Sequence, residues 1–468
     1  MKRKLAALAV ALSMVCSLTA CGGNTTAIND SGSSESTDGA GTVEDTGETA
    51  EDTTASEGSG STEGITISLM TMNTREEAET NGYQYAFWKA VDEWKEAHPD
   101  VTVLEETMDQ TSYQTKINAV ASSGDMPDIF ALKGSWTNSF VQNEWVADIT
   151  DDVADVQGIY VDNAFKFATV EDRIYGVPKQ SQCTGLVYYN TELWSEIGYD
   201  EFPATWDELL DAVEKFKEKG ITAFVMGNKA NWPAESCWLS TLGSRFTGDE
   251  WTYSIVDGSG AKFTDESFVK ALECFQDLAK RGAFNADINS LDDTEQNTVY
   301  FNKKAAAIAN GDWFISTINN SAPEDVKAST KLALLPAVNG GSDDQTTISG
   351  GCIWFWAMSS NKMSSEKRAL TIDLLKYVTS QQVGNDTAEH GDSPAVKNPE
   401  YDTTKTSDLF NEYQELVKKA KYVPVYDGCM DASVCETMNT GLQSLLIDQT
   451  TPEDLASAIQ LEQDQVVN

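Results

Sequence analysis

Ile65-Thr66-Ile67-Ser68-Leu69 is the first stretch of the chain with a clear structural period, and it decides the fold class. Its apolar and polar residues alternate, which is typical of a β-strand. Apolar residues then recur at helical spacing until Pro99, and Val101-Thr102-Val103-Leu104 forms a second strand pattern. A further helical pattern from Tyr113 to Ala121 leads into the strand ending at Phe130. This strand-helix-strand order predicts an α/β fold with mostly parallel sheets flanked by helices.

The later part of the chain continues the alternation of strands and helices. Thr205 and Glu208 have the spacing of a capping box, and Gly220 ends the helix that they begin. Two more helices are predicted, from Thr264 to Gly282 and from Ala369 to Val378. Pro452 in the first turn opens the last predicted helix.

Composition excludes several classes of function. The chain has 468 residues, enough for two lobes, and a formal net charge of −41 with 2 His. Nucleic-acid phosphates require Lys and Arg, so we expect no nucleic-acid partner. With so little His, we expect no metal site, no Ser/His triad, no catalytic residue and no cofactor.

The N-terminal residues have the pattern of a signal peptide for export. A basic segment, Lys2-Arg3-Lys4, precedes an apolar run from Leu5 to Leu18 that is too short to span a membrane. Leu18-Thr19-Ala20-Cys21-Gly22 resembles a bacterial lipobox, which implies cleavage after residue 20 and a lipid on Cys21. The alternative is an ordinary signal peptide with a chance Cys. We expect residues 1–20 to be a lipoprotein signal peptide and the protein to be anchored to the outer face of a bacterial cell membrane.

Residues 21–64 are predicted to be a disordered tether behind the lipidated Cys21. They are rich in Ser, Thr, Gly and acidic residues and contain no Lys or Arg. Such a composition cannot bury enough apolar surface to offset the entropy of ordering.

Gly311-Asp312-Trp313-Phe314 is the stretch that most directly suggests a ligand site. It follows the apolar run Ala305-Ala306-Ala307-Ile308-Ala309, so a strand of small residues would enter a tight turn that delivers a Trp. An aromatic side chain displayed by a turn either belongs to the core or recognises a ligand. Residue pattern alone leaves both interpretations open.

Several motifs in order resemble extracellular solute-binding proteins of carbohydrate ABC transporters, the maltose- and oligosaccharide-binding group. The motifs are Gly124 to Phe130, Tyr175-Gly176-Val177-Pro178, Tyr189-Asn190 with the helix from Thr205 to Leu209, Ala307 to Trp313, Leu335 to Val338, Gly350-Gly351 and Ser359 to Tyr377.

The resemblance implies a two-lobed periplasmic-binding-protein-like fold with a ligand cleft between the lobes. It places lobe 1 in residues 65–180 plus 350–395 and lobe 2 in residues 181–349 plus 396–468. The expected function is capture of a sugar, with an oligosaccharide as the expected ligand, by cleft closure and its delivery to the ABC transporter permease subunits. We expect a monomer and no enzyme activity.

The resemblance also implies which residues hold the ligand. A sugar needs flat aromatic platforms for its C–H faces and polar groups for its hydroxyls. Trp313 matches the stacking position, with Asp312 beside it as a hydroxyl acceptor. Asn231-Trp232 falls at the contact segment of lobe 2, and Lys133 and Trp136 fall at that of lobe 1.

Further contacts are expected at the crossovers between the lobes. Gln182 lies where some relatives carry a ligand-binding carboxylate, and the absence of an acid there weakens a maltose-like specificity. Gly351 and Trp354 lie in the next crossover. Near the C-terminus, Tyr426, Asp427 and Asp431 lie where relatives close the cleft, and we expect Asp431 to contact the ligand.

Two rival functions and one structural question stay open at this point. A secreted glycoside hydrolase would need two carboxylates at a defined separation, and no motif singles out such a pair. A binding protein for a non-sugar solute is the other rival. Beyond Cys16 and Cys21, six cysteines permit disulfides or free thiols equally: 183, 237, 274, 352, 429 and 435.

Overall fold

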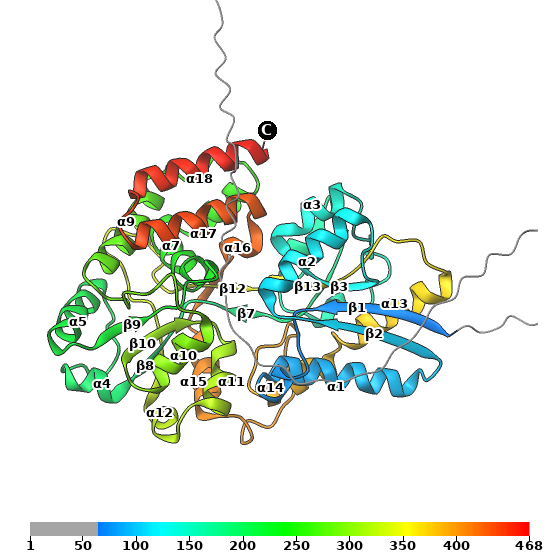
Figure 1. Ribbon diagram of the computed structural model, residues 1–468, viewed down its shortest axis with the longest axis horizontal. Coiled ribbons are helices and arrows are strands. Elements are labelled where there is room, and N and C mark those ends of the chain that lie inside the picture. The colour runs from blue at the N-terminus through cyan, green and yellow to red at the C-terminus, as the bar shows by residue number, and fades with distance from the viewer. Residues whose placement is uncertain (1–63, 468) are drawn as a thin grey trace, which may run out of the picture. The chain divides into compact units, whose positions relative to one another are not determined.

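The computed structural model describes residues 64–467 (Figure 1). They belong to one unit, residues 62–468, which we call the body. The predicted signal peptide, the lipidation site Cys21 and the predicted tether up to residue 63 lie outside the described residues. Within the body, two main sheets each have their own apolar core, and we call each sheet with its helices a lobe.

The first lobe is built on a sheet with the strand order β2-β1-β3-β13-β6. β1 runs parallel to β2 and β3, as the strand-helix-strand pattern predicts, whereas β13 runs antiparallel to β3 and β6. The antiparallel strand enters from far along the chain, where the sequence gives no pairing signal. The strands are β1 (Ile65–Thr71), β2 (Val101–Thr107), β3 (Ile129–Lys133), β6 (Val177–Pro178) and β13 (Trp354–Met358).

The helices predicted in the first lobe are present, but the last of them begins at Ser365 rather than at the predicted Ala369. Asn81 caps α1 by accepting a hydrogen bond from the Gln84 amide at 2.8 Å, and the helix ends before Pro99. Phe87 of α1 stacks on Trp356 of β13, with ring centroids 4.6 Å apart. The elements are η1 (Glu77–Glu79), α1 (Gly82–Ala97), α2 (Gln110–Ser123), η2 (Gly134–Trp136), α3 (Thr137–Gln142), η3 (Gln157–Ile159), η4 (Lys166–Ala168), β4 (Thr169–Val170), β5 (Arg173–Ile174), α13 (Ser365–Tyr377) and α14 (Gln381–Glu389).

The second lobe is built on a sheet with the order β11-β8-β10-β9. β8 and β10 are buried along their whole length, which explains their continuous apolar sequence. β10 pairs antiparallel with β8 and parallel with β9, so this sheet is also mixed. Its strands are β8 (Leu186–Asn190), β9 (Thr222–Val225), β10 (Ala305–Asn310) and β11 (Thr330–Leu334).

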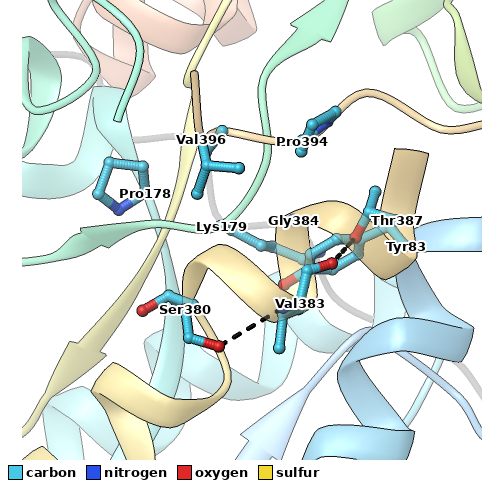
Figure 2. Close-up of a pocket in the computed structure, with 11 residues that line it drawn as sticks. Tyr83, Pro178, Lys179, Ser380, Val383, Gly384, Thr387, Pro394 and Val396 are labelled. Carbon is cyan, nitrogen blue, oxygen red and sulfur yellow. Dashed lines mark hydrogen bonds between the residues drawn. The ribbon is translucent and has the colours of Figure 1, made fainter. Parts of the chain in front are cut away.

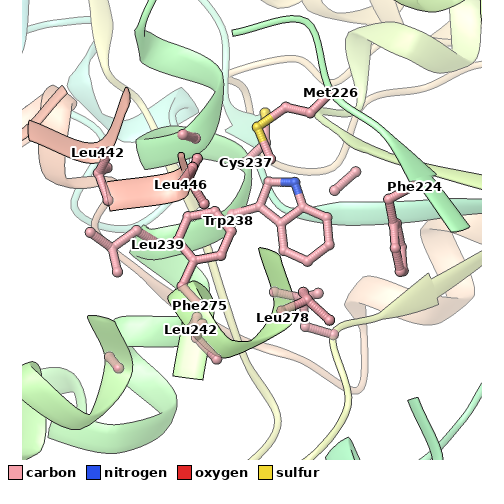
Figure 3. Packing of buried hydrophobic residues seen from close by; sticks show 14 of the residues in the cluster. Phe224, Met226, Cys237, Trp238, Leu239, Leu242, Phe275, Leu278, Leu442 and Leu446 are labelled. Carbon is pink, nitrogen blue, oxygen red and sulfur yellow. The ribbon is translucent and has the colours of Figure 1, made fainter. Parts of the chain in front are cut away.

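The helices of the second lobe enclose a core centred on Trp238 (Figure 3). The Trp238 ring stacks on Phe275 at 5.7 Å and meets the edge of Phe224 at 5.0 Å. The predicted capping box of Thr205 and Glu208 is confirmed at the start of α5. The helices are α4 (Thr191–Glu196), α5 (Trp206–Lys219), α6 (Trp232–Ala234), the π-helix η5 (Glu235–Leu239), α7 (Ser240–Thr247), α8 (Asp249–Val256), α9 (Glu266–Lys280), α10 (Asp293–Phe301), α11 (Trp313–Ser321), α12 (Glu324–Ser329), α15 (Asp408–Val417), α16 (Tyr426–Cys429), α17 (Ala432–Leu446) and α18 (Pro452–Val467).

A small third sheet lies where the chain crosses between the lobes. β7 (Gln182–Cys183) and β12 (Thr347–Gly351) pair antiparallel, and β14 (Lys421–Val423) runs parallel to β12. Buried hydroxyls join this sheet to α7: the Ser349 Oγ lies 2.6 Å from the Thr184 Oγ1 and 2.7 Å from the Thr241 Oγ1. These buried hydrogen bonds hold the crossover strand β12 against α7 of the second lobe.

The six cysteines of the described chain are free thiols. All are buried except Cys274, which is half-buried. No helix within residues 64–467 combines the length and the apolar character that crossing a membrane requires.

Candidate functional site

A cavity of ≈ 720 Å³ draws its walls from both lobes and from the crossover. It is large enough for a ligand of several hundred Å³, the usual size range of small-molecule sites. Its walls combine three Trp side chains with many side-chain amides, which offer both donors and acceptors. The amides are Asn73, Asn81, Gln84, Gln110, Gln180, Gln182, Asn297 and Asn310.

Trp313 lines the cavity from the second lobe, immediately after β10. Tyr188 donates a hydrogen bond to the Gly311 carbonyl at 2.7 Å, and the Asp312 amide donates to the Cys183 carbonyl at 2.9 Å, which holds the turn. A Cβ on Gly311 would lie 2.0 Å from the Trp313 ring. The glycine is therefore required because the indole folds back over it.

Trp232 lines the cavity beside Trp313. The two ring centroids are 6.0 Å apart and the ring planes meet at 61°, so the indoles form a corner rather than a stack. Asn231 precedes α6 in the left-handed backbone conformation, with φ 61°. The helix then changes to the π-helix η5, a rare form that often accompanies functional sites.

Trp354 and Lys133 line the cavity from the first lobe and are direct partners across β13 and β3. The Lys133 Nζ lies 5.6 Å from the centroid of the Trp354 ring and 2.6 Å from the Asp427 Oδ2. Burial disfavours the Lys133 ammonium, but the attraction of Asp427 outweighs it and raises the pKa of Lys133. Asp427 also lines the cavity, so this buried ion pair forms part of its polar wall.

Of the residues predicted to hold a ligand, Trp313, Trp232, Trp354, Lys133 and Gln182 line the cavity. The remaining predicted residues lie outside its wall: Asp312, Asn231, Trp136, Gly351 and Asp431.

The structure gives three of these outer residues another setting. Trp136 is buried in the first core and meets the edge of Trp354 at 5.4 Å, so it supports the cavity tryptophan from behind. Asp431 caps α17 by accepting from the Ser433 amide at 2.9 Å. Gly351 pairs with Gln182 across β7 and β12 and has a φ of 115°, which favours glycine.

Asp312 is buried beneath the turn that carries Trp313. Its Oδ2 accepts from the Tyr413 hydroxyl at 3.1 Å, and its Oδ1 is buried without a hydrogen-bond partner. Burial, together with the charge of Asp392, raises the pKa of Asp312 to about 7. The Asp312 carboxyl therefore helps to hold the turn through Tyr413, and its charge changes near neutral pH.

Sequence reasoning did not select several polar residues of the cavity wall. Lys179 directly follows the Val177-Pro178 motif, and Asn310 directly precedes Gly311. Both residues lie next to motifs that the sequence analysis recognised, and this position was the signal that could have identified them. The sequence does not show whether the side chain at such a position points into the cavity.

The cavity wall places aromatic and polar groups side by side. Within residues 64–467, no group of three or more His, Cys, Asp or Glu side chains is arranged to hold a metal ion. The wall offers aromatic faces beside amides, hydroxyls and charged groups, which suits a ligand with apolar faces and polar edges.

Solved structures with similar folds are two-lobed binding proteins. A chitin oligosaccharide binding protein superposes with a TM-score of 0.78 and 24% identity over 86% of this chain and 98% of that chain. A structure from work on xylan utilisation by Caldanaerobius polysaccharolyticus has a TM-score of 0.75 and 26% identity over 86% of this chain and 100% of that chain. These likenesses confirm the predicted two-lobed α/β fold.

Among curated proteins, the galactooligosaccharide-binding protein of Bacillus subtilis is 26% identical over 233 residues, which cover 48% of this chain and 52% of that protein. The match therefore spans about half the length of that relative. A probable ABC transporter-binding protein of Deinococcus radiodurans is 23% identical over 73% of this chain and 79% of that protein.

Residues 77–385, more than half of the chain, match the family described as bacterial extracellular solute-binding protein. They contain the motifs that first suggested the resemblance, from Gly124 to Tyr377, and all the residues that line the cavity except Met72, Asn73 and Asp427. The chain belongs to the bacterial extracellular solute-binding protein family.

Proposed function

We propose that this protein captures an oligosaccharide in the cavity and delivers it to the permease subunits of an ABC transporter. The observation that carries the proposal is the pairing of Trp232 and Trp313 from one lobe with Trp354 from the other around one cavity. Indole faces suit the C–H faces of sugar rings, and the surrounding amides suit the hydroxyls. The relatives named for galactooligosaccharide and chitin oligosaccharide binding support this ligand class.

Capture would work through the relative movement of the two lobes. A ligand held by groups from both lobes stabilises the closed form more than the open form and shifts the equilibrium toward it. The chain crosses between the lobes through the short strands β7 and β12, where a small change in backbone angles moves whole lobes. Specificity follows from the hydroxyls, since each buried polar group left unpaired costs ~1–3 kcal/mol.

The protein would act as a monomer at the outer face of the cell membrane, held by a lipid on Cys21. The support for this is the sequence Leu18-Thr19-Ala20-Cys21 behind a basic and apolar leader. Metabolic labelling with a fatty-acid analogue should label the wild type and not Cys21→Ala.

The body, residues 62–468, holds both lobes and the cavity and serves as the test protein. A thermal-shift screen against a panel of oligosaccharides should raise its melting temperature with at least one member, since a ligand that binds only the native state stabilises it. Product analysis of the same mixtures should show intact sugars. Turnover would replace the proposal with a hydrolase, and a response to peptides or metal ions alone would replace the ligand class.

A further inference from the structure

Lys179 occupies a distinctive place at the edge of the first lobe. Its backbone amide donates to the Trp354 carbonyl at 3.0 Å, which extends the pairing of β6 with β13 by one residue. Immediately afterwards the chain leaves the first sheet and crosses toward β7. Lys179 is 7% exposed and lines both the large cavity and a small pocket of ≈ 10 Å³. Figure 2 shows the small pocket.

The Lys179 ammonium has no counter-charge in contact with it. Its Nζ lies over the Tyr83 ring, 5.0 Å from the centroid, and forms no ion pair with any carboxylate of the described residues. The acidic groups that attract it from a greater distance are Asp392 and Glu77. Asp392 already accepts from the backbone amides of Tyr83 and Ser393, and Glu77 accepts from Gln84.

The carboxylates of the cavity wall contrast with Lys179, because each has a donor from the protein. Asp427 pairs with Lys133, Asp109 and Asp292 cap α2 and α10, Asp293 accepts from Gln296, and Glu77 accepts from Gln84. Glu77, Asp109 and Asp293 are exposed and Asp292 is half-exposed, so water and salt screen them. Among the buried charged side chains of the wall, Lys133 and Asp427 cancel, and Lys179 is left unpaired.

A buried ammonium without a hydrogen-bonded counter-ion is costly, and a bound anion would remove that cost. Building on the proposal that the cavity takes an oligosaccharide, we propose that its ligand carries a carboxylate, as a uronic acid residue does, and that Lys179 pairs with it. The sugar rings then lie against Trp232, Trp313 and Trp354. One lysine provides one positive charge, which suits one carboxylate.

The charge of Lys179 depends on pH in the range where binding is measured. Burial lowers the pKa of Lys179 to about 7, against the opposing attraction of Asp392 and Glu77. The phenol of Tyr83, which faces the ammonium, stays neutral in this range because burial raises its pKa well above the usual value. A ligand carboxylate favours the protonated amine, so binding above pH 7 must take up a proton and the affinity should fall as pH rises.

The test uses the body and pairs of ligands that differ in one group. Each uronic-acid-containing oligosaccharide of a panel is compared with the same oligosaccharide after reduction of its carboxylate to a primary alcohol. Calorimetry at pH 6.5 should show at least one acidic sugar that binds roughly tenfold to a hundredfold more tightly than its reduced partner, the range expected for a hydrogen bond to a charged group. The preference should shrink at pH 8.5.

Two substitutions assign the preference to the residue. Lys179→Met keeps the approximate length of the side chain and should abolish the preference, so that the acidic sugar and its reduced partner bind with equal affinity, and Lys179→Arg should retain the preference. Melting temperatures report whether each variant is folded.

The outcomes separate this inference from the proposed function. If neutral sugars bind and no acidic sugar binds more tightly than its reduced partner, the inference is wrong and oligosaccharide capture stands. If the preference survives in folded Lys179→Met, another group recognises the carboxylate and the assignment to Lys179 is wrong. If no sugar of either kind binds, both proposals are wrong.

Discussion

At the scale of single residues, Trp313 combines structural and binding contacts. The indole packs over Gly311 and against Trp232, and it borders the cavity. Trp313→Ala should therefore weaken oligosaccharide binding about tenfold or more, which is a loss of ~1.4 kcal/mol. Because the side chain is only half-buried, the melting temperature should change little.

The matched control is Trp136→Ala, which removes a buried indole that does not line the cavity. It should destabilise the body by ~3–5 kcal/mol, as large-to-small core changes do. The two readouts are calorimetric affinity and urea unfolding. Unfolding of Trp313→Ala without a separate loss of affinity would show that Trp313 serves the core alone.

Asp312 should make the stability of the body depend on pH. Its pKa is about 7 in the folded protein because of burial and the charge of Asp392, and an unfolded Asp titrates near ~3.9. Between these values the folded state holds a proton that the unfolded state has lost, so stability falls as pH rises from about 4 to 7.

The variant Asp312→Asn has no proton to lose, so its melting temperature should vary less than that of the wild type over this window. Asp431→Asn is the control, since Asn also caps helices well and Asp431 lies outside the cavity wall. An unchanged pH profile in Asp312→Asn would mean that another group, such as Asp392, carries the dependence.

At the scale of elements, the turn between β10 and α11 decides where the Trp313 indole lies. In Gly311→Ala the new Cβ would lie 2.0–2.4 Å from three atoms of the ring, so the indole must move. We expect a loss of sugar affinity of the same order as in Trp313→Ala, with the fold retained.

Gly158→Ala is the matched control for this substitution. A Cβ at Gly158 would meet no atom within 4 Å, and its φ is not positive, so affinity and stability should match the wild type. Wild-type affinity in Gly311→Ala would show that the position of the indole is unimportant for binding.

The sequence predicts elements better than it predicts the directions of side chains. The capping box at Thr205, the end of α1 before Pro99 and the fold class all follow from local periods and caps. Local patterns could not tell that Trp354 lines the cavity and that Trp136 does not, because both follow a buried strand. The pairing of Trp354 with Lys133 across β13 and β3 places it at the cavity, with Trp136 behind it. Asp431 was misleading for a similar reason: a carboxylate near the ligand and a helix cap look alike in the sequence.

At the scale of the whole molecule, the buried ion pair of Lys133 and Asp427 joins β3 to α16. The two segments are in close contact nearby, since a Cβ on Gly134 would lie 2.3 Å from the Gly428 carbonyl oxygen. Lys133→Met leaves a buried carboxylate without its partner, which should cost ~3–5 kcal/mol in urea unfolding.

Replacement of both partners, Lys133→Met with Asp427→Leu, should recover most of this loss, because apolar residues often replace a buried pair at little cost. Lys418→Met serves as the control, since its pair with Glu415 is exposed to water and its loss should leave the unfolding midpoint nearly unchanged. Equal losses in the single and double variants would mean that the packing of Lys133, rather than the charge pair, stabilises the junction.

The free thiols give the body a built-in reporter of its own unfolding. Five of the six cysteines in the described chain are buried, and burial raises the pKa of all six, so little of the reactive thiolate forms in the native state. A maleimide pulse followed by mass spectrometry would then distinguish folded molecules, which stay almost unlabelled, from unfolded molecules, which are labelled at every cysteine. Because four of the cysteines lie in helices of the second lobe and Cys352 packs in the core of the first, intermediate masses would identify a lobe that opens on its own.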